Sequence, residues 1–150
     1  MLRSIFRMAS DGERSKIYPG IPEYFDSEGR GMYHYLTGSA SWLVLTQLIH
    51  VFGVRGSRGN LMLAPQLVKE EFDKKGIASV KCHFAGHCLS VEYHNPRALD
   101  AGQYAVKEVL IRGQRGDALK IPLPKGPAQD KACIPRTFLT QDALIKVTLG

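Results

Sequence analysis

The sequence predicts an α+β chain in which a helix-and-loop region precedes an antiparallel β-sandwich. Three observations lead to this fold class. An apolar helical segment covers residues 42–52, an alternation of period two begins after residue 60, and turn residues separate the alternating segments. We therefore expect two domains, residues 1–56 and residues 57–150.

The first domain is expected to begin and end with helix. Leu2–Met8 is typical of the last turns of a helix whose beginning lies upstream. The segment that follows, residues 11–36, is irregular and rich in Gly and Pro, and irregular segments of this length inside compact domains are usually functional. We expect Ser39 to cap the next helix and Gly53 to take the left-handed conformation at its end.

The helix over residues 42–52 is apolar around most of its circumference, with a narrow polar wedge of Thr46, Gln47 and His50. A surface helix needs an apolar stripe of only about 100°. This helix therefore requires partners on several sides, with Trp42 in the core, and the chain has little other helical material. We expect the chain to be the C-terminal part of something larger, and the isolated chain to dimerise or aggregate.

The second domain is expected to contain short antiparallel strands separated by Gly, Pro and Asn turns. Two hairpins are expected, one turning at Ala85-Gly86 and one over residues 112–116. Four prolines break residues 122–135 into a loop or an edge. The strands are expected at residues 61–64, 77–84, 88–93, 105–111, 118–121 and 143–149.

Composition limits the partners and the compartment. The 150 residues carry a net charge of +6, but the basic residues are scattered, which argues against nucleic acid and is compatible with anionic substrates. The longest apolar stretch, residues 42–52, is too short and too polar for a membrane span, so a soluble protein is expected. Three cysteines without CxxC spacing indicate a reducing cytoplasm rather than a disulfide framework.

One cluster of metal-ligating residue types occurs, Cys82-His83 followed by His87-Cys88. Zinc binding is one interpretation. A hairpin turning at Ala85-Gly86 is the simpler one, because alternation places Cys82 and His83 on opposite faces. We expect no metal site, and no catalytic cysteine.

The turn Thr37-Gly38-Ser39 lies at the start of the apolar helix. Backbone N–H groups at a helix start have no intrahelical partner, and the helix dipole adds partial positive charge, so such an end attracts anions, phosphate above all. Gly38 has no Cβ and lets a ligand approach the backbone closely. The alternative is a plain N-terminal cap with no ligand.

A longer motif contains this turn. The string GERSKIYPGIPEYFDSEGRGMYHYLTGSASW, followed by FGVRG and NLMLAPQL, resembles glycoside hydrolase family 94 from about residue 12 to residue 67. That family comprises inverting glycoside phosphorylases such as cellobiose, cellodextrin and laminaribiose phosphorylases, with a related domain in cyclic β-1,2-glucan synthases. The resemblance implies that residues 1–56 are the last helices of an (α/α)6 catalytic barrel and residues 57–150 its C-terminal β-sandwich.

The resemblance also implies an activity. Family members cleave a β-glucosidic bond with inorganic phosphate, as a hexosyltransferase, and release an α-sugar 1-phosphate without a further cofactor. In the family, the Thr and Gly of the LTG turn help to hold phosphate, so Thr37 and Gly38 take this role by match. The family's general-acid Asp lies upstream of the matched segment. We therefore assign no catalytic residue and expect the chain alone to be inactive.

Three further residues are candidates for sugar binding. Relatives place a Gln or Glu near Glu23, against a sugar hydroxyl, although a solvated loop acid is the alternative. Tyr24 and His34 have rings suited to pyranose contacts, and His34 is also a candidate neighbour of phosphate; packing is the alternative for both. The partner implied is a β-linked gluco-oligosaccharide of undetermined linkage. Competing hypotheses are a non-catalytic carbohydrate-binding β-sandwich module and a non-functional truncation.

Overall fold

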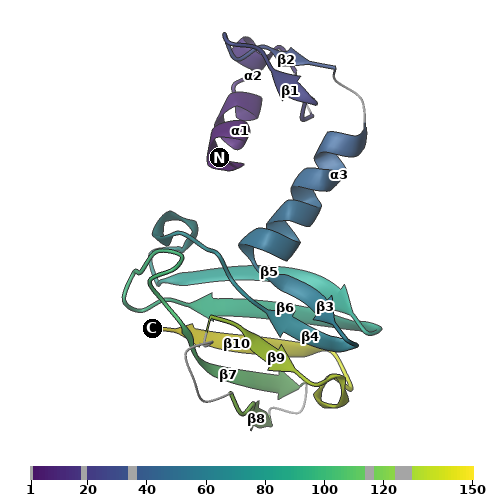
Figure 1. The fold of residues 1–150 in the computed structure, drawn as a ribbon, viewed down its shortest axis with the longest axis vertical. Helices are drawn as coiled ribbons and strands as arrows, with labels where there is room; N and C mark the ends of the chain where they lie inside the picture. Colours follow the sequence, from purple (N-terminus) through teal and green to yellow (C-terminus); the bar gives the residue numbers. More distant parts are fainter. Residues whose placement is uncertain (1, 18–19, 34–36, 114–116, 124–129) are drawn as a thin grey trace. The chain divides into compact units, whose positions relative to one another are not determined.

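A computed structural model of the chain describes residues 2–17, 20–33, 37–113, 117–123 and 130–150 (Figure 1). The chain divides into two compact units, Met1–Thr46 and Gln47–Gly150. Each unit is described by itself below.

The unit Met1–Thr46 combines short helices with one small sheet. It contains α1 (Leu2–Ser10), α2 (Gly12–Ser15), the antiparallel pair β1 (Tyr24–Phe25) and β2 (Gly31–Met32), and α3 (Thr37–Thr46). Ser15 and Ile17 are buried inside this unit. Gly31 is packed so closely against Ile17 and Pro22 that a Cβ at this position would overlap the Ile17 side chain. The loop is therefore organised around the end of α2.

The unit Gln47–Gly150 is built from two sheets. A π-helical turn, Gln47–Val51, precedes a three-stranded sheet of order β3-β4-β9 and a five-stranded sheet of order β5-β6-β10-β7-β8. The strands are β3 (Val54–Ser57), β4 (Asn60–Leu63), β5 (Ile77–Phe84), β6 (His87–His94), β7 (Val106–Gly113), β8 (Ala118–Lys120), β9 (Ala132–Ile134) and β10 (Ala143–Leu149). Short 3-10 turns cover Lys69–Glu71 and Arg136–Phe138.

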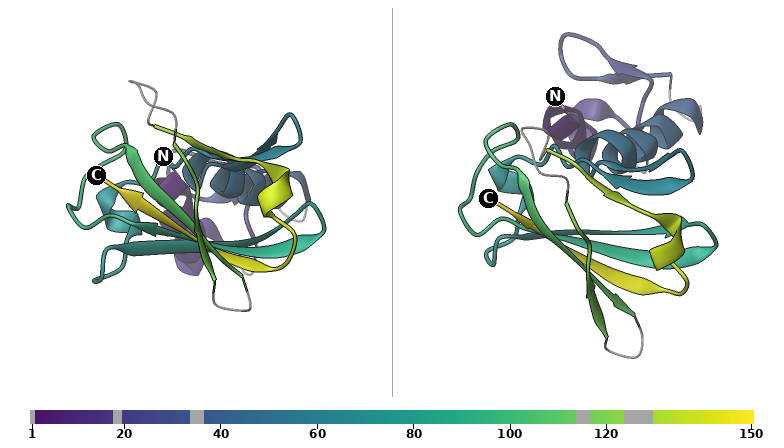
Figure 2. Two further views of the ribbon diagram at one scale, coloured as in Figure 1. Left: turned by 90° about the horizontal axis from the view of Figure 1, so that it is seen from below. Right: turned by 60° about the horizontal axis from the view of Figure 1, so that its bottom comes forward.

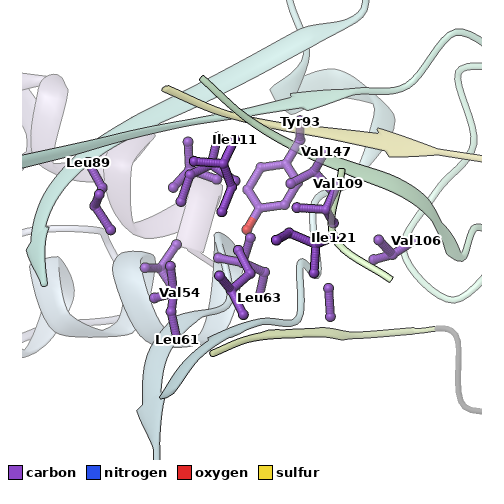
Figure 3. Packing of buried hydrophobic residues seen from close by; sticks show 14 of the residues in the cluster. Val54, Leu61, Leu63, Leu89, Tyr93, Val106, Val109, Ile111, Ile121 and Val147 are labelled. Atoms are coloured by element: carbon purple, nitrogen blue, oxygen red, sulfur yellow. The ribbon is translucent and has the colours of Figure 1, made fainter. Parts of the chain in front are cut away.

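One hydrophobic core joins the two sheets. Alternate residues of the longer strands point into it, as the pleat requires, and Figures 2 and 3 show the smaller sheet lying against one face of the larger one. Tyr93 reaches from β6 toward Leu63, and its hydroxyl donates to the Phe52 carbonyl oxygen at 2.5 Å. The largest fully buried side chains include Leu61, Leu63, Leu89, Val91, Val109, Ile134, Ile145 and Leu149.

The predicted fold class is wrong. The described residues contain three short α-helices and three sheets, and no set of barrel helices. The larger sheet is mixed rather than antiparallel, because β10 pairs parallel with β6 and antiparallel with β7. The apolar segment that suggested barrel helices forms only the ten-residue α3 and the π-helical turn. Trp42, expected in the core, is 71% exposed.

Several local expectations are confirmed. The strands β5, β6, β7 and β10 lie within two residues of their predicted ends. Ala85 and Gly86 have φ angles of 53° and 87° and close the β5–β6 hairpin, as a two-residue turn of this type requires. Gly53 has φ of 67° just after the π-helical turn. The predicted hairpin turn over 112–116 lies partly outside the described residues.

The cap predicted at Ser39 is wrong. Helix α3 begins at Thr37, so Ser39 lies in its first turn, and its hydroxyl donates instead to the Ile21 carbonyl oxygen at 3.0 Å. Among the described residues there is no helix with the length and apolar character that a membrane crossing demands.

Candidate functional site

The loop before α3 is fixed by local hydrogen bonds. Asp11 caps α2 by accepting the Arg14 amide at 3.1 Å, and Lys16 ends it in the left-handed conformation. The Arg14 guanidinium then donates to the Glu28 carbonyl oxygen at 2.6 Å. Asp26 accepts two amides, from Glu28 and Arg30, both at 2.9 Å. These contacts bring the β1–β2 turn back toward α2.

Glu23 lies at the amino end of α3. Its Oε1 accepts the Ser39 amide at 3.3 Å, and a Cβ built on Gly38 would lie 3.6 Å from the same oxygen. A carboxylate at a helix start meets the unpaired amides and the positive end of the dipole, which is a favourable position for an anion. The amino end of α3 therefore holds the protein's own carboxylate, and both Glu23 and Gly38 are exposed to solvent.

Two exposed tyrosines lie beside Glu23. The Tyr24 and Tyr33 ring centroids are 5.5 Å apart with the planes tilted by 44°, and the residues are 51% and 62% exposed. Desolvation, and after it the neighbouring Tyr33, raise the pKa of Tyr24, so its phenol remains a neutral donor at physiological pH. Tyr33 has φ of 53°, which is uncommon for a residue with a Cβ. Exposed aromatic faces with hydroxyl tips are suited to sugar rings.

The structure brings together Glu23, Tyr24 and the backbone of the Thr37-Gly38-Ser39 turn. The structure adds Tyr33, whose ring lies beside that of Tyr24. His34 and the Thr37 side chain, both predicted to lie near phosphate, fall outside what the structure describes. The Glu23–Ser39 contact spans 16 positions, and no local pattern indicated it.

The Cys82–Cys88 region forms the β5–β6 hairpin. His83 pairs with Cys88 across the ladder, whereas Cys82 pairs with the buried Leu89. Burial raises the pKa of the Cys82 thiol. In the part of the chain that the structure describes, no group of three His, Cys, Asp or Glu residues is arranged to hold a metal ion. All three cysteines are free thiols.

No protein-family model matches this chain, and no curated protein matches it. We therefore infer a function from the geometry of the Glu23 site and from the sequence motif around it.

Proposed function

We propose that this chain provides the phosphate- and sugar-binding segment of an inverting glycoside phosphorylase. The observation that carries the proposal is the contact between Glu23 and the amino end of α3. The contact supports the proposal because a carboxylate can accept hydrogen bonds from sugar hydroxyls and a helix start attracts anions, and the reaction brings a sugar and a phosphate together. The motif resemblance over residues 12–67 supports the same assignment.

The proposed roles follow from the chemistry of each group. Phosphate meets the backbone of Thr37 and Gly38, where the absence of a Cβ permits close approach. Glu23 accepts hydrogen bonds from hydroxyl groups of the bound sugar, and the Tyr24–Tyr33 pair contacts the face of the sugar ring. A phosphate oxygen attacks the anomeric carbon as the glycosidic C–O bond breaks on the opposite face. The leaving oxygen takes its proton from a carboxylic acid.

That acid is not among the residues assigned here, since the resemblance places it upstream of the matched segment. We therefore expect no turnover by the chain alone. We also propose a cytoplasmic location, because free cysteines suit a reducing compartment.

Titration of the isotopically labelled chain with inorganic phosphate, followed by NMR, tests the phosphate role. We expect saturable shifts of the Gly38 and Ser39 amide signals. Gly38→Val places a branched side chain toward Glu23 and is expected to abolish these shifts, whereas Gly59→Ala, at a turn of the unit Gln47–Gly150 with open space around it, leaves them unchanged. Amide signals of the helix start that stay fixed at saturating phosphate would sink the proposal.

A second candidate function is sugar binding without chemistry, and the exposed tyrosine pair is the observation that favours it. Cello-oligosaccharide titration separates the two candidates. If oligosaccharide shifts the signals around Tyr24 and Tyr33 while phosphate shifts none at Gly38, the chain is a binding module.

A further inference from the structure

The five-stranded sheet has a polar face turned away from the core. The alternation that buries Val91 and Val147 sends their neighbours to the opposite side. The ladder register places His94, Thr148 and Glu108 side by side across β6, β10 and β7. The next row contains Glu92, Lys146 and Leu110.

This face contains a cavity of about 330 Å³. Ligand pockets range from ~300 to ~1,000 Å³, so the volume suits a small ligand. The charged and hydroxyl-bearing residues of its lining come from three strands and one turn: Lys75, His94, Glu108, Arg112, Lys146 and Thr148.

The lining carries an excess of positive charge. The Glu108 carboxylate is engaged by Lys120 at 2.6 Å, and His94 lies 3.4 Å from Glu92. Arg112 and Lys146 form no ion pair with any residue that the structure describes. Lys146 is also half-buried, in the strand at the centre of the sheet. Glu92 is the cross-strand neighbour of Lys146 but makes no ion pair with it, so an anionic ligand would give this half-buried ammonium a direct ion pair.

The rim of the cavity is preorganised. Lys75 belongs to a tight turn in which Asp73 accepts the amides of Lys75 and Ile77 at 2.8 and 2.9 Å. These backbone donors, that of Ile77 first, lower the pKa of Asp73. Gly76 has φ of 72° and fits against the Asn95 carbonyl oxygen, 3.0 Å from where a Cβ would be. The turn therefore fixes the backbone of Lys75 beside the sheet, so that only the side chain has to be ordered on binding.

We propose that this cavity binds a phosphorylated monosaccharide. The phosphate lies against Lys146, Arg112 and Lys75, and the sugar hydroxyls meet Glu108 and Thr148. Glu108 favours a sugar phosphate over inorganic phosphate. Its carboxylate repels any oxyanion, but it accepts hydrogen bonds from the hydroxyl groups that only the sugar phosphate has. Single-stranded nucleic acid is disfavoured, because its bases stack on aromatic side chains and the lining contains no Phe, Tyr or Trp. This inference does not rest on the proposed function.

The test is an NMR titration of the full chain with glucose 1-phosphate. We expect saturable shifts at residues 75–76, 94–95, 108–112 and 146–148, weakening as salt is added. Inorganic phosphate should bind more weakly, and glucose should give no saturable shift. Shifts at Gly38 and Ser39 alone would overturn this inference while leaving the proposed function standing. Inorganic phosphate binding as tightly as the ester would also overturn it.

A pair of matched variants locates the contact. Lys146→Gln should weaken glucose 1-phosphate binding about tenfold, the effect of losing one charge-assisted hydrogen bond. Lys131→Gln removes the same charge from an exposed position next to β9, in the other sheet, and should leave the affinity unchanged. Thermal unfolding of both variants checks that they are folded. Equal affinities for the two folded variants would contradict the assignment.

Discussion

At the scale of single residues, the buried phenol of Tyr104 joins the loop before β7 to the loop after β4. The Tyr104 hydroxyl donates to the Leu67 carbonyl oxygen at 2.9 Å and accepts the Leu67 amide at 2.8 Å. Both backbone polar groups of the buried Leu67 are thus satisfied by a single side chain. Burial, the larger effect, raises the pKa of Tyr104 to about 12, above its ordinary value of about 10.

The raised pKa predicts alkaline instability. Tyr104 is protonated in the folded state up to about pH 12, whereas the unfolded chain loses that proton near pH 10. The stabilisation is therefore complete below about pH 10 and is lost as the pH rises toward about 12. Tyr104→Phe should cost about 1–3 kcal/mol at neutral pH, because the Leu67 groups lose their partner, and should flatten the alkaline decline.

Urea unfolding between pH 7 and pH 11 measures both effects. Tyr24→Phe is the matched control, since Tyr24 is exposed, and it should retain the parent's neutral-pH stability. A Tyr104→Phe variant as steep in its alkaline decline as the parent would show that another group titrates.

Glu23 gives the second prediction at this scale. Its carboxylate and a bound phosphate carry like charge at the same helix end, so they repel each other. Glu23→Gln should therefore bind inorganic phosphate about threefold more tightly at low salt, with a smaller gain at high salt. NMR titration of the Gly38 and Ser39 amides measures the affinity. Glu28→Gln, an exposed acid of the same loop, should change it little. Weaker phosphate binding by Glu23→Gln would contradict the repulsion.

At the scale of elements, Gly53 forms the connection between the π-helical turn and β3. With φ of 67°, it lies so close to the Ala64 carbonyl that a Cβ would overlap it. Gly53→Ala should therefore cost about 2 kcal/mol or more of folding stability, by denaturant unfolding. Gly59→Ala is the matched control, because Gly59 has φ of 80° and open space around it. It should cost about 1 kcal/mol, the backbone penalty alone. Equal losses of folding stability in the two variants would show that the overlap with Ala64 is removed by small shifts that cost little free energy.

The sequence carried enough information for the long strands but not for their arrangement. Alternation marks Ile77–Phe84 and Ala143–Leu149 clearly, because each has one buried face. β3 and β9 are too short to show a period, and Gly56 interrupts the first. The parallel pairing of β10 with β6 is set by a crossover between sheets, which no local pattern encodes.

The same limit applies to the two sites. Glu23 and Gly38 were named because a local motif contains both, while their contact depends on the loop that Arg14 and Asp26 hold. The cationic cavity has no motif at all. Its members are brought together only by strand register and by one turn, from positions 75, 94, 112 and 146.

At the scale of the whole molecule, the hydrophobic core lies entirely within one unit. Every buried residue of the core cluster falls between Val54 and Leu149. The buried tyrosine hydroxyls also find their partners there, at Phe52 and Leu67. The free energy of folding of Gln47–Gly150 should therefore come from contacts within that unit.

This distribution predicts that Gln47–Gly150 folds when produced without the preceding residues. Its thermal midpoint should lie within about 5 °C of the transition that near-UV circular dichroism reports in the full chain, a difference equivalent to roughly 1 kcal/mol. Leu63→Ala, which opens a cavity between the two sheets, should cost about 2–5 kcal/mol in both the excised unit and the full chain. If the excised unit lacked a cooperative transition, the core described here would depend on residues before Gln47. If only the full chain responded to Leu63→Ala, the same conclusion would follow, because the cavity would then matter only when Met1–Thr46 is present.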